Sequence, residues 1–241
     1  MPEDDNNSLI EHLQDLRTAL LRCLLAVALL FPLGYLAAPH CINFLVDWSF
    51  PDNLPALHYF SPLEVFLVQL KMALILALVA AYPWNLRQLW QFLLPALYEQ
   101  ERRCLRTWLL LASLLFFAGI AFCVLTVLPL LLNFAASFAS PQLQPLLGLQ
   151  NFLQLAGWLM LAFGIMFQTP VLVVLLVRSG IVPAETLRRQ RPVVLTVILI
   201  LAAILTPPDV ISQLLLAIPS WLLFELGLLL AKSPQTSLPQ E

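Results

Sequence analysis

Acidic side chains in the polar segments of this sequence could bind a cationic ligand. Glu11 and Asp15 precede a long apolar run, and Glu101 lies in a polar stretch between two further runs. Carboxylates hold guanidinium groups through charge-assisted, often bidentate hydrogen bonds. Another role stays open for each site. Glu101 can pair with nearby loop arginines, which would stabilise the chain by only about 0 to 1 kcal/mol. Asp15 can stabilise the helix that follows it, because a negative charge is favourable near the positive N-terminal end of a helix.

Three polar side chains, Lys71, Gln168 and Glu225, lie inside apolar runs. Polar groups in such runs are costly to place in a membrane, so the ionisable Lys71 and Glu225 are candidates for function, with Gln168 as a related polar case. Lys71 can extend its ammonium outward, and Glu225 can pair with a neighbouring or partner helix. Gln168 is neutral and cannot carry a proton, which favours a helix contact for it.

The sequence contains no evident set of residues for covalent catalysis. It has no nucleotide-binding loop and no metal-ligand cluster, and no nucleophile–base pairing is evident. We therefore expect neither an enzyme nor a cofactor, and the charge pattern gives no sign of nucleic-acid binding. The histidines outside the apolar runs are His12, His40 and His58, and the widely spaced cysteines are Cys23, Cys41, Cys104 and Cys123.

The composition indicates a membrane protein. Of 241 residues, 61% are hydrophobic and 11% are charged, and the mean hydropathy is +0.88. In lipid, backbone polar groups must be satisfied within helices or a closed barrel, and barrel strands alternate apolar with polar residues. The runs here are continuous and rich in leucine. The sequence therefore predicts an all-α, polytopic membrane protein.

Six apolar runs are candidates for membrane spans, since a spanning helix needs roughly 20 such residues. The first is long and follows an acidic start, so we expect a retained helix rather than a signal peptide. The fifth is short, and the sixth can be short too. The alternative to two spans here is one continuous segment 193–231, but its adjacent prolines disfavour it, and Thr206, Pro207 and Asp209 fit the cap of a new helix. The predicted spans are 18–38, 63–84, 107–132, 153–178, 193–205 and 210–231.

The basic residues predict the orientation of these spans. The loops expected at 39–62, 133–152 and 206–209 contain no lysine or arginine, whereas the other connections are rich in arginine. Cytoplasmic loops carry an excess of both residues, so both termini are predicted to be cytoplasmic. Residues 1–241 then form a single membrane domain. Its predicted cytoplasmic segments are 1–17, 85–106, 179–192 and 232–241.

Several stretches, in the same order along nearly the whole chain, resemble the TatC family, the multi-span subunit of the twin-arginine protein translocase. The stretch with the most distinctive pattern has Phe92, then Pro95-x-Leu97-Tyr98, then Glu101-Arg102-Arg103. The others are His12 to Arg17, Phe163-Gly164 through Phe167 to Pro170, Leu187 to Pro192, and Thr206 to Asp209 with Gln213.

The resemblance implies a receptor in the bacterial inner membrane that binds twin-arginine signal peptides. With single-span partners of the TatA and TatB type, in an oligomeric complex, it would export folded proteins using the proton-motive force. By motif position, Glu101 would receive the arginine pair, with Asp15 or Glu11 assisting. Phe92, Pro95 and Leu97 would offer an apolar surface. Gln168, Glu225, Asp209 and Gln213 are the candidate intramembrane or partner-facing residues.

Two other classes of function remain as alternatives. A secondary transporter of a small solute would have paired broken helices around a midplane site, and apart from the short fifth run the sequence shows none. An intramembrane enzyme would need catalytic residues meeting at one depth, and no such set can be assembled. The capping geometry also explains Asp209 as well as a functional role does.

Overall fold

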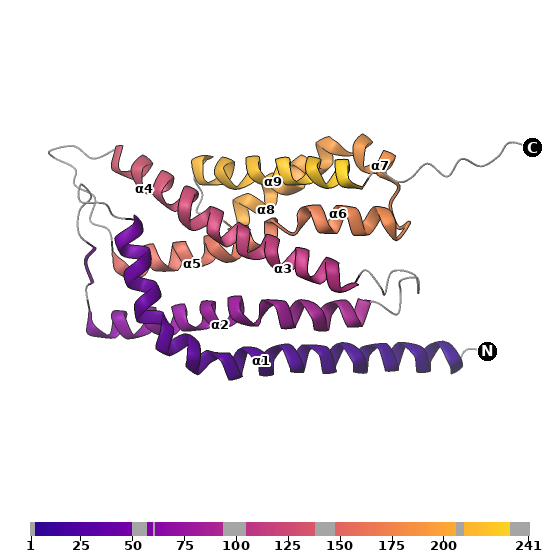
Figure 1. Cartoon of the computed structure of the whole chain (residues 1–241), viewed down its shortest axis with the longest axis horizontal. Helices are drawn as coiled ribbons and strands as arrows, with labels where there is room; N and C mark the ends of the chain where they lie inside the picture. Colours follow the sequence, from indigo (N-terminus) through magenta and orange to yellow (C-terminus); the bar gives the residue numbers. More distant parts are fainter. Residues whose placement is uncertain are drawn as a thin grey trace, which may run out of the picture.

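The computed structural model describes residues 3–49, 57–59, 61–93, 105–137, 148–205 and 210–231. In these residues the chain is helical, apart from short connections and a single bridge between His58 and Gly148. The helices form an elongated bundle (Figure 1). They are α1 (Glu3–Ser49), α2 (Pro62–Leu93), α3 (Leu105–Phe122), a π-helical turn (Cys123–Val127), α4 (Leu128–Ser137), α5 (Leu149–Met166), α6 (Thr169–Arg178), α7 (Ala184–Arg189), α8 (Arg191–Leu205) and α9 (Val210–Leu230).

The helical, membrane-spanning character predicted from the sequence is confirmed. Five stretches of the described chain are long and apolar enough to cross a membrane. The predicted fifth span corresponds to α8, which has 15 residues and falls short of the roughly 20 that a full crossing needs. The count of six spans therefore stays a prediction. The five long stretches are Leu13–Ser49, Pro62–Gln91, Thr107–Ser137, Leu149–Arg178 and Gln213–Leu230.

Several helix ends differ from the prediction, most of all in the first helix. Helix α1 begins at Glu3 and continues through Pro39 to Ser49, across part of the predicted loop 39–62. A proline inside a helix removes a hydrogen bond and bends the axis, and Figure 1 shows α1 turning sharply in its second half. The helix persists beyond the proline because Leu45 and Ser49 are buried, each 1% exposed. Burial in the bundle therefore outweighs the local break.

The third membrane-length stretch contains a π-helical turn that the sequence analysis did not predict. Here the Leu128 N–H donates to the Cys123 carbonyl, one residue beyond the α-helical pattern. The next donor along the chain would be residue 129, which is proline and has no N–H. The Val124 carbonyl is instead satisfied by the Trp48 indole, with 3.2 Å between Nε1 and the oxygen. The turn thus joins the end of α1 to the middle of the bundle.

The predicted span 153–178 is also interrupted. Helix α5 ends at Met166 and α6 begins at Thr169, with Pro170 in the first turn of α6. Proline is favoured at the start of a helix and disfavoured inside one, which accounts for the position of the break.

Helices α1 and α2 pack antiparallel through small residues. Gly34 of α1 approaches α2 so closely that a Cβ added to it would lie 2.5 Å from the Ala73 carbonyl oxygen. Ala73, Ala77 and Ala81 of α2 are all buried. Small residues let helix backbones approach within a membrane, so this contact fixes how the two helices are aligned.

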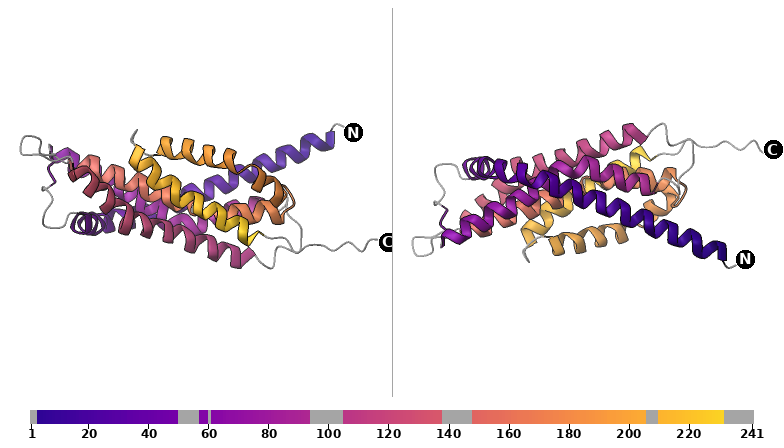
Figure 2. Two further views of the ribbon diagram at one scale, coloured as in Figure 1. Left: turned by 90° about the horizontal axis from the view of Figure 1, so that it is seen from above. Right: turned by 90° about the horizontal axis from the view of Figure 1, so that it is seen from below.

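The long helices alternate in direction, which gathers five segment ends at one end of the bundle. The start of α1, the end of α2, the start of α3, the α6–α7 connection and the end of α9 lie at the right of Figure 1. Figure 2 shows α1 crossing one face obliquely, with its start projecting beyond its neighbours, and α8 at the edge of the bundle. We call this the motif end, because the stretch that begins at Phe92 starts there, in the last turn of α2. Which side of a membrane it faces stays a prediction.

Candidate functional site

The carboxylate of Asp15 lies level with the end of α2. The Cys23 thiol on α1 lies 3.9 Å from the Asn85 carbonyl oxygen on α2, which fixes the register of these antiparallel helices. Asp15 lies eight residues before Cys23, and Leu93 lies eight residues after Asn85. Both steps correspond to about 12 Å along the helix axis. The Asp15 side chain is exposed there.

The structure therefore places Asp15 of α1 level with the end of α2, where the distinctive motif begins. Glu11 lies one turn before Asp15, on the same side of α1. Phe92 lies in the last turn of α2. For Glu11 and Phe92 the structure describes the backbone alone, and Pro95, Leu97 and Glu101 lie outside the described residues. Their approach to Asp15 stays a prediction.

Aromatic rings hold two of the arginines in this part of the chain. The guanidinium carbon of Arg178, at the end of α6, lies 5.2 Å from the centre of the Trp108 ring on α3. That of Arg87 lies 5.8 Å from the centre of the Trp84 ring on α2. A cation over an aromatic face is held by the ring quadrupole. These two arginines are thus positioned without a carboxylate partner in the described part of the chain.

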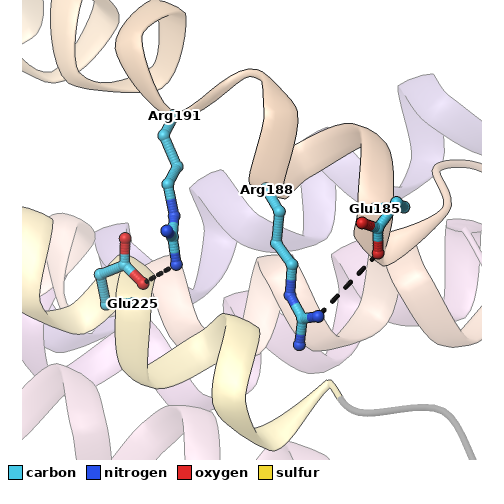
Figure 3. A network of polar contacts seen from close by, with 4 residues as sticks. All are labelled: Glu185, Arg188, Arg191 and Glu225. Carbon is cyan, nitrogen blue, oxygen red and sulfur yellow. Dashed lines mark hydrogen bonds and ion pairs between the residues drawn. The ribbon is translucent and has the colours of Figure 1, made fainter.

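Glu225 forms an ion pair that joins α9 to the start of α8. Its Oε2 lies 2.7 Å from Nη2 of Arg191, and its side chain is 28% exposed (Figure 3). A helix partner for Glu225 is predicted from the sequence, but Arg191 is placed there in a cytoplasmic loop. Figure 3 also shows Glu185 and Arg188 on α7, whose 3.9 Å contact is more exposed and contributes little.

Gln213 and Gln168 each bind a backbone carbonyl on another helix. The Gln213 amide nitrogen on α9 donates to the Leu199 carbonyl of α8 across 3.0 Å. Together with the Glu225 pair, this attaches α8 to α9 at two levels. The Gln168 amide, between α5 and α6, donates to the Ala112 carbonyl of α3, also across 3.0 Å. Asp209, grouped with these residues in the sequence analysis, and the helix cap proposed for 206–209 lie outside the described residues.

Lys71 has a partner that the sequence analysis missed. Its Nζ lies 3.1 Å from Oε1 of Gln154, which links α2 to α5. The signal in the sequence was the pair Gln150 and Gln154, which share one side of a largely apolar helix at a spacing of one turn.

Comparison with known proteins finds the same family along nearly the whole chain. Residues 11–219 match the sequence model of the Sec-independent protein translocase protein TatC. The TatC protein of Escherichia coli strain K12 is 38% identical over 236 residues, which cover 96% of this chain and 91% of that protein. The Haemophilus influenzae TatC is 36% identical, covering 95% and 90% respectively.

Solved structures agree with the sequence comparison. A crystal structure of the twin-arginine translocase receptor TatC in DDM superposes with a TM-score of 0.84 at 31% identity, covering 92% of this chain and all of that one. A second crystal structure of this receptor gives a TM-score of 0.81. Since the match spans sequence and fold alike, the chain belongs to the TatC family of Sec-independent protein translocase proteins.

Proposed function

We propose that this chain is the signal-peptide receptor and core scaffold of a twin-arginine translocase. In this role it binds the paired arginines of a signal peptide at the motif end of the bundle. The observation that carries the proposal is the position of Asp15, an exposed carboxylate level with the last turn of α2. The solved relatives are themselves twin-arginine translocase receptors.

Recognition in this proposal depends on carboxylates supplied by two segments. Asp15 and Glu11 approach from α1, and Glu101 approaches from the segment that follows α2. Each planar guanidinium can donate two parallel hydrogen bonds to one carboxylate, whereas a lysine ammonium presents a compact point charge. Phe92, Pro95 and Leu97 supply an apolar surface for the neighbouring residues of the peptide. The site then prefers two arginines to two lysines.

The scaffold role rests on the polar contacts inside the bundle. Gln213 and Glu225 fix α8 against α9, and Gln168 fixes the start of α6 against α3. The short α8 leaves apolar side chains such as Val193, Ile200 and Ile204 more than half exposed. We propose that single-span subunits of the TatA and TatB type join the chain in an oligomeric complex, which moves folded cargo with the proton-motive force.

Site-specific crosslinking tests the location of the receptor site. A photoreactive residue at Leu16, next to Asp15, should crosslink to a twin-arginine signal peptide, because Leu16 borders the proposed site and is 37% exposed. The same residue at Leu36, on the far part of α1 and 71% exposed, is the matched control and should not crosslink. Equal labelling from both positions, or equal labelling of a Lys-Lys peptide, would refute the site.

A further inference from the structure

A pocket of about 360 Å³ lies between α2 and α5, away from the residues of the proposed receptor site. Its walls are apolar, with Met72 and Leu78 from α2 and Leu161 from α5 among them, and its polar groups are Lys71, Gln150 and Gln154. Lys71 and Gln154 are exposed, so the polar part of the pocket is open to the surroundings of the bundle.

The polar groups gather toward one end of the pocket. Gln150 and Gln154 lie in the first two turns of α5 (Leu149–Met166), at the end of the bundle opposite the motif end (Figure 1). Lys71 lies nine residues into α2, about 13 Å from its start, whereas Leu78 is deeper, at about 24 Å. Leu161 lies correspondingly farther along α5. The pocket is thus polar near the end of the bundle and apolar toward its middle.

This gradient matches the depth profile of a lipid bilayer. Helix α2 has 32 residues, or about 48 Å, and the hydrocarbon core is about 30 Å thick. If α2 is centred in the membrane, which moves the hydrocarbon core toward its C-terminal half relative to the predicted span 63–84, about 9 Å extends on either side and Lys71 lies about 4 Å inside the boundary between headgroups and hydrocarbon. At that depth a bound phospholipid places its phosphate beside Lys71 and an acyl chain along the deeper walls.

The charge of the pocket favours an anion. The partner of the Lys71 ammonium is a neutral amide, and in the described part of the chain no carboxylate lies within 4.0 Å of it. Glu64, two turns earlier on α2, accepts a hydrogen bond from the Gln150 backbone N–H through Oε1 at 3.2 Å, where its charge complements the start of α5. A cation that lies inside the hydrocarbon boundary is costly unless it is paired.

We propose that the α2–α5 pocket binds one anionic phospholipid, with the phosphate held by Lys71, Gln150 and Gln154 and an acyl chain lying against Met72, Leu78 and Leu161. The polar end supplies an ammonium and two amides as donors. The apolar walls are continuous with the lipid that surrounds the helices, so a chain can enter from the side.

Native mass spectrometry of the full-length protein tests this site. The protein is purified in detergent and exposed to equal amounts of phosphatidylglycerol and phosphatidylcholine with the same acyl chains. Wild type should retain one phosphatidylglycerol with about tenfold preference. Both lipids carry the phosphate, but the choline cation of phosphatidylcholine compensates its charge and would lie near the Lys71 ammonium, which weakens binding by an amount of that order. Lys71→Gln keeps a donor toward Gln154 but removes the charge, and should lose the preference.

Three further variants separate lipid binding from folding. Lys71→Arg should keep the preference, and Lys232→Gln, which removes the same charge elsewhere in the sequence, should leave it unchanged. Leu78→Trp should reduce retention of both lipids by filling the apolar part. If Lys71→Gln keeps the preference, or if wild type retains both lipids equally, the proposal is wrong. A carboxylate on a partner's membrane helix would then be the better match for Lys71.

Discussion

The Glu225 carboxylate on α9 accepts a hydrogen bond from the Arg191 guanidinium at the start of α8, with 2.7 Å between Oε2 and Nη2. Helix α8 is short and lies at the edge of the bundle, so this pair and the Gln213 contact hold it in place. The position of α8 therefore depends on a few polar contacts to a greater extent than the positions of the long helices do.

Breaking this pair should loosen α8. We expect Glu225→Ala to lower the free energy of unfolding by about 1 kcal/mol, because Glu225 is largely buried but Arg191 is partly exposed. Thermal unfolding in detergent measures the change. Glu185→Ala is the control, since its 3.9 Å contact with Arg188 is exposed and should have almost no effect. Exchanging the two residues, Arg191→Glu with Glu225→Arg, should recover most of the loss, and a double-mutant cycle with no coupling would contradict this account.

The contact between Trp48 and the π-helical turn should contribute to stability as well. Trp48→Phe removes the donor that satisfies the Val124 carbonyl while keeping an aromatic ring, and should cost about 1 kcal/mol. Trp84→Phe is a matched control, because Trp84 and Trp48 are each 47% exposed and the ring facing Arg87 is kept. Equal shifts in the midpoint of thermal unfolding for the two variants would argue against the hydrogen bond.

The close crossing of α1 and α2 predicts that Gly34 does not tolerate a side chain. Gly34→Val should destabilise the protein by about 1 to 3 kcal/mol, because its Cβ would meet the Ala73 carbonyl, which belongs to a rigid backbone. It should also disturb the register that places Asp15 level with the end of α2. Ala37→Val, at an exposed position about one turn further along α1, should leave the unfolding midpoint nearly unchanged. A tolerated Gly34→Val would mean that the helices do not cross as closely as described.

Much of the fold could be predicted from the sequence, because long apolar runs have few possible structures in a membrane. The family, the helical architecture and the location as a multi-pass protein of the bacterial inner membrane are confirmed. The ends of the helices were harder to predict from the sequence. Pro39 favoured a loop locally, but burial of Leu45 and Ser49 extends α1 beyond it. The π-helical turn depends jointly on residue 129 and on Trp48, which is distant in sequence.

For the polar contacts inside the bundle, one partner could be predicted from the sequence and the other could not. Lys71, Gln168 and Glu225 could be selected from the sequence because polar groups are unusual in apolar runs. Their partners could not, since Gln154, the Ala112 carbonyl and Arg191 come from other helices and are set by the packing. The level of Asp15 likewise follows from the α1–α2 register and not from any motif. The approach of Glu101 stays a prediction.

Binding of a twin-arginine signal peptide to the full-length protein in lipid nanodiscs tests the central proposal most directly. Wild type should bind the peptide, and a Lys-Lys version should bind more weakly, because lysine cannot form the bidentate contacts. Asp15→Asn and Glu101→Gln should each weaken binding of the Arg-Arg peptide by about tenfold. Asp47→Asn, an exposed acid near the other end of α1, should bind like wild type. If both peptides bind wild type equally, or if Asp15→Asn and Glu101→Gln bind as tightly as Asp47→Asn, the receptor site is not where we place it.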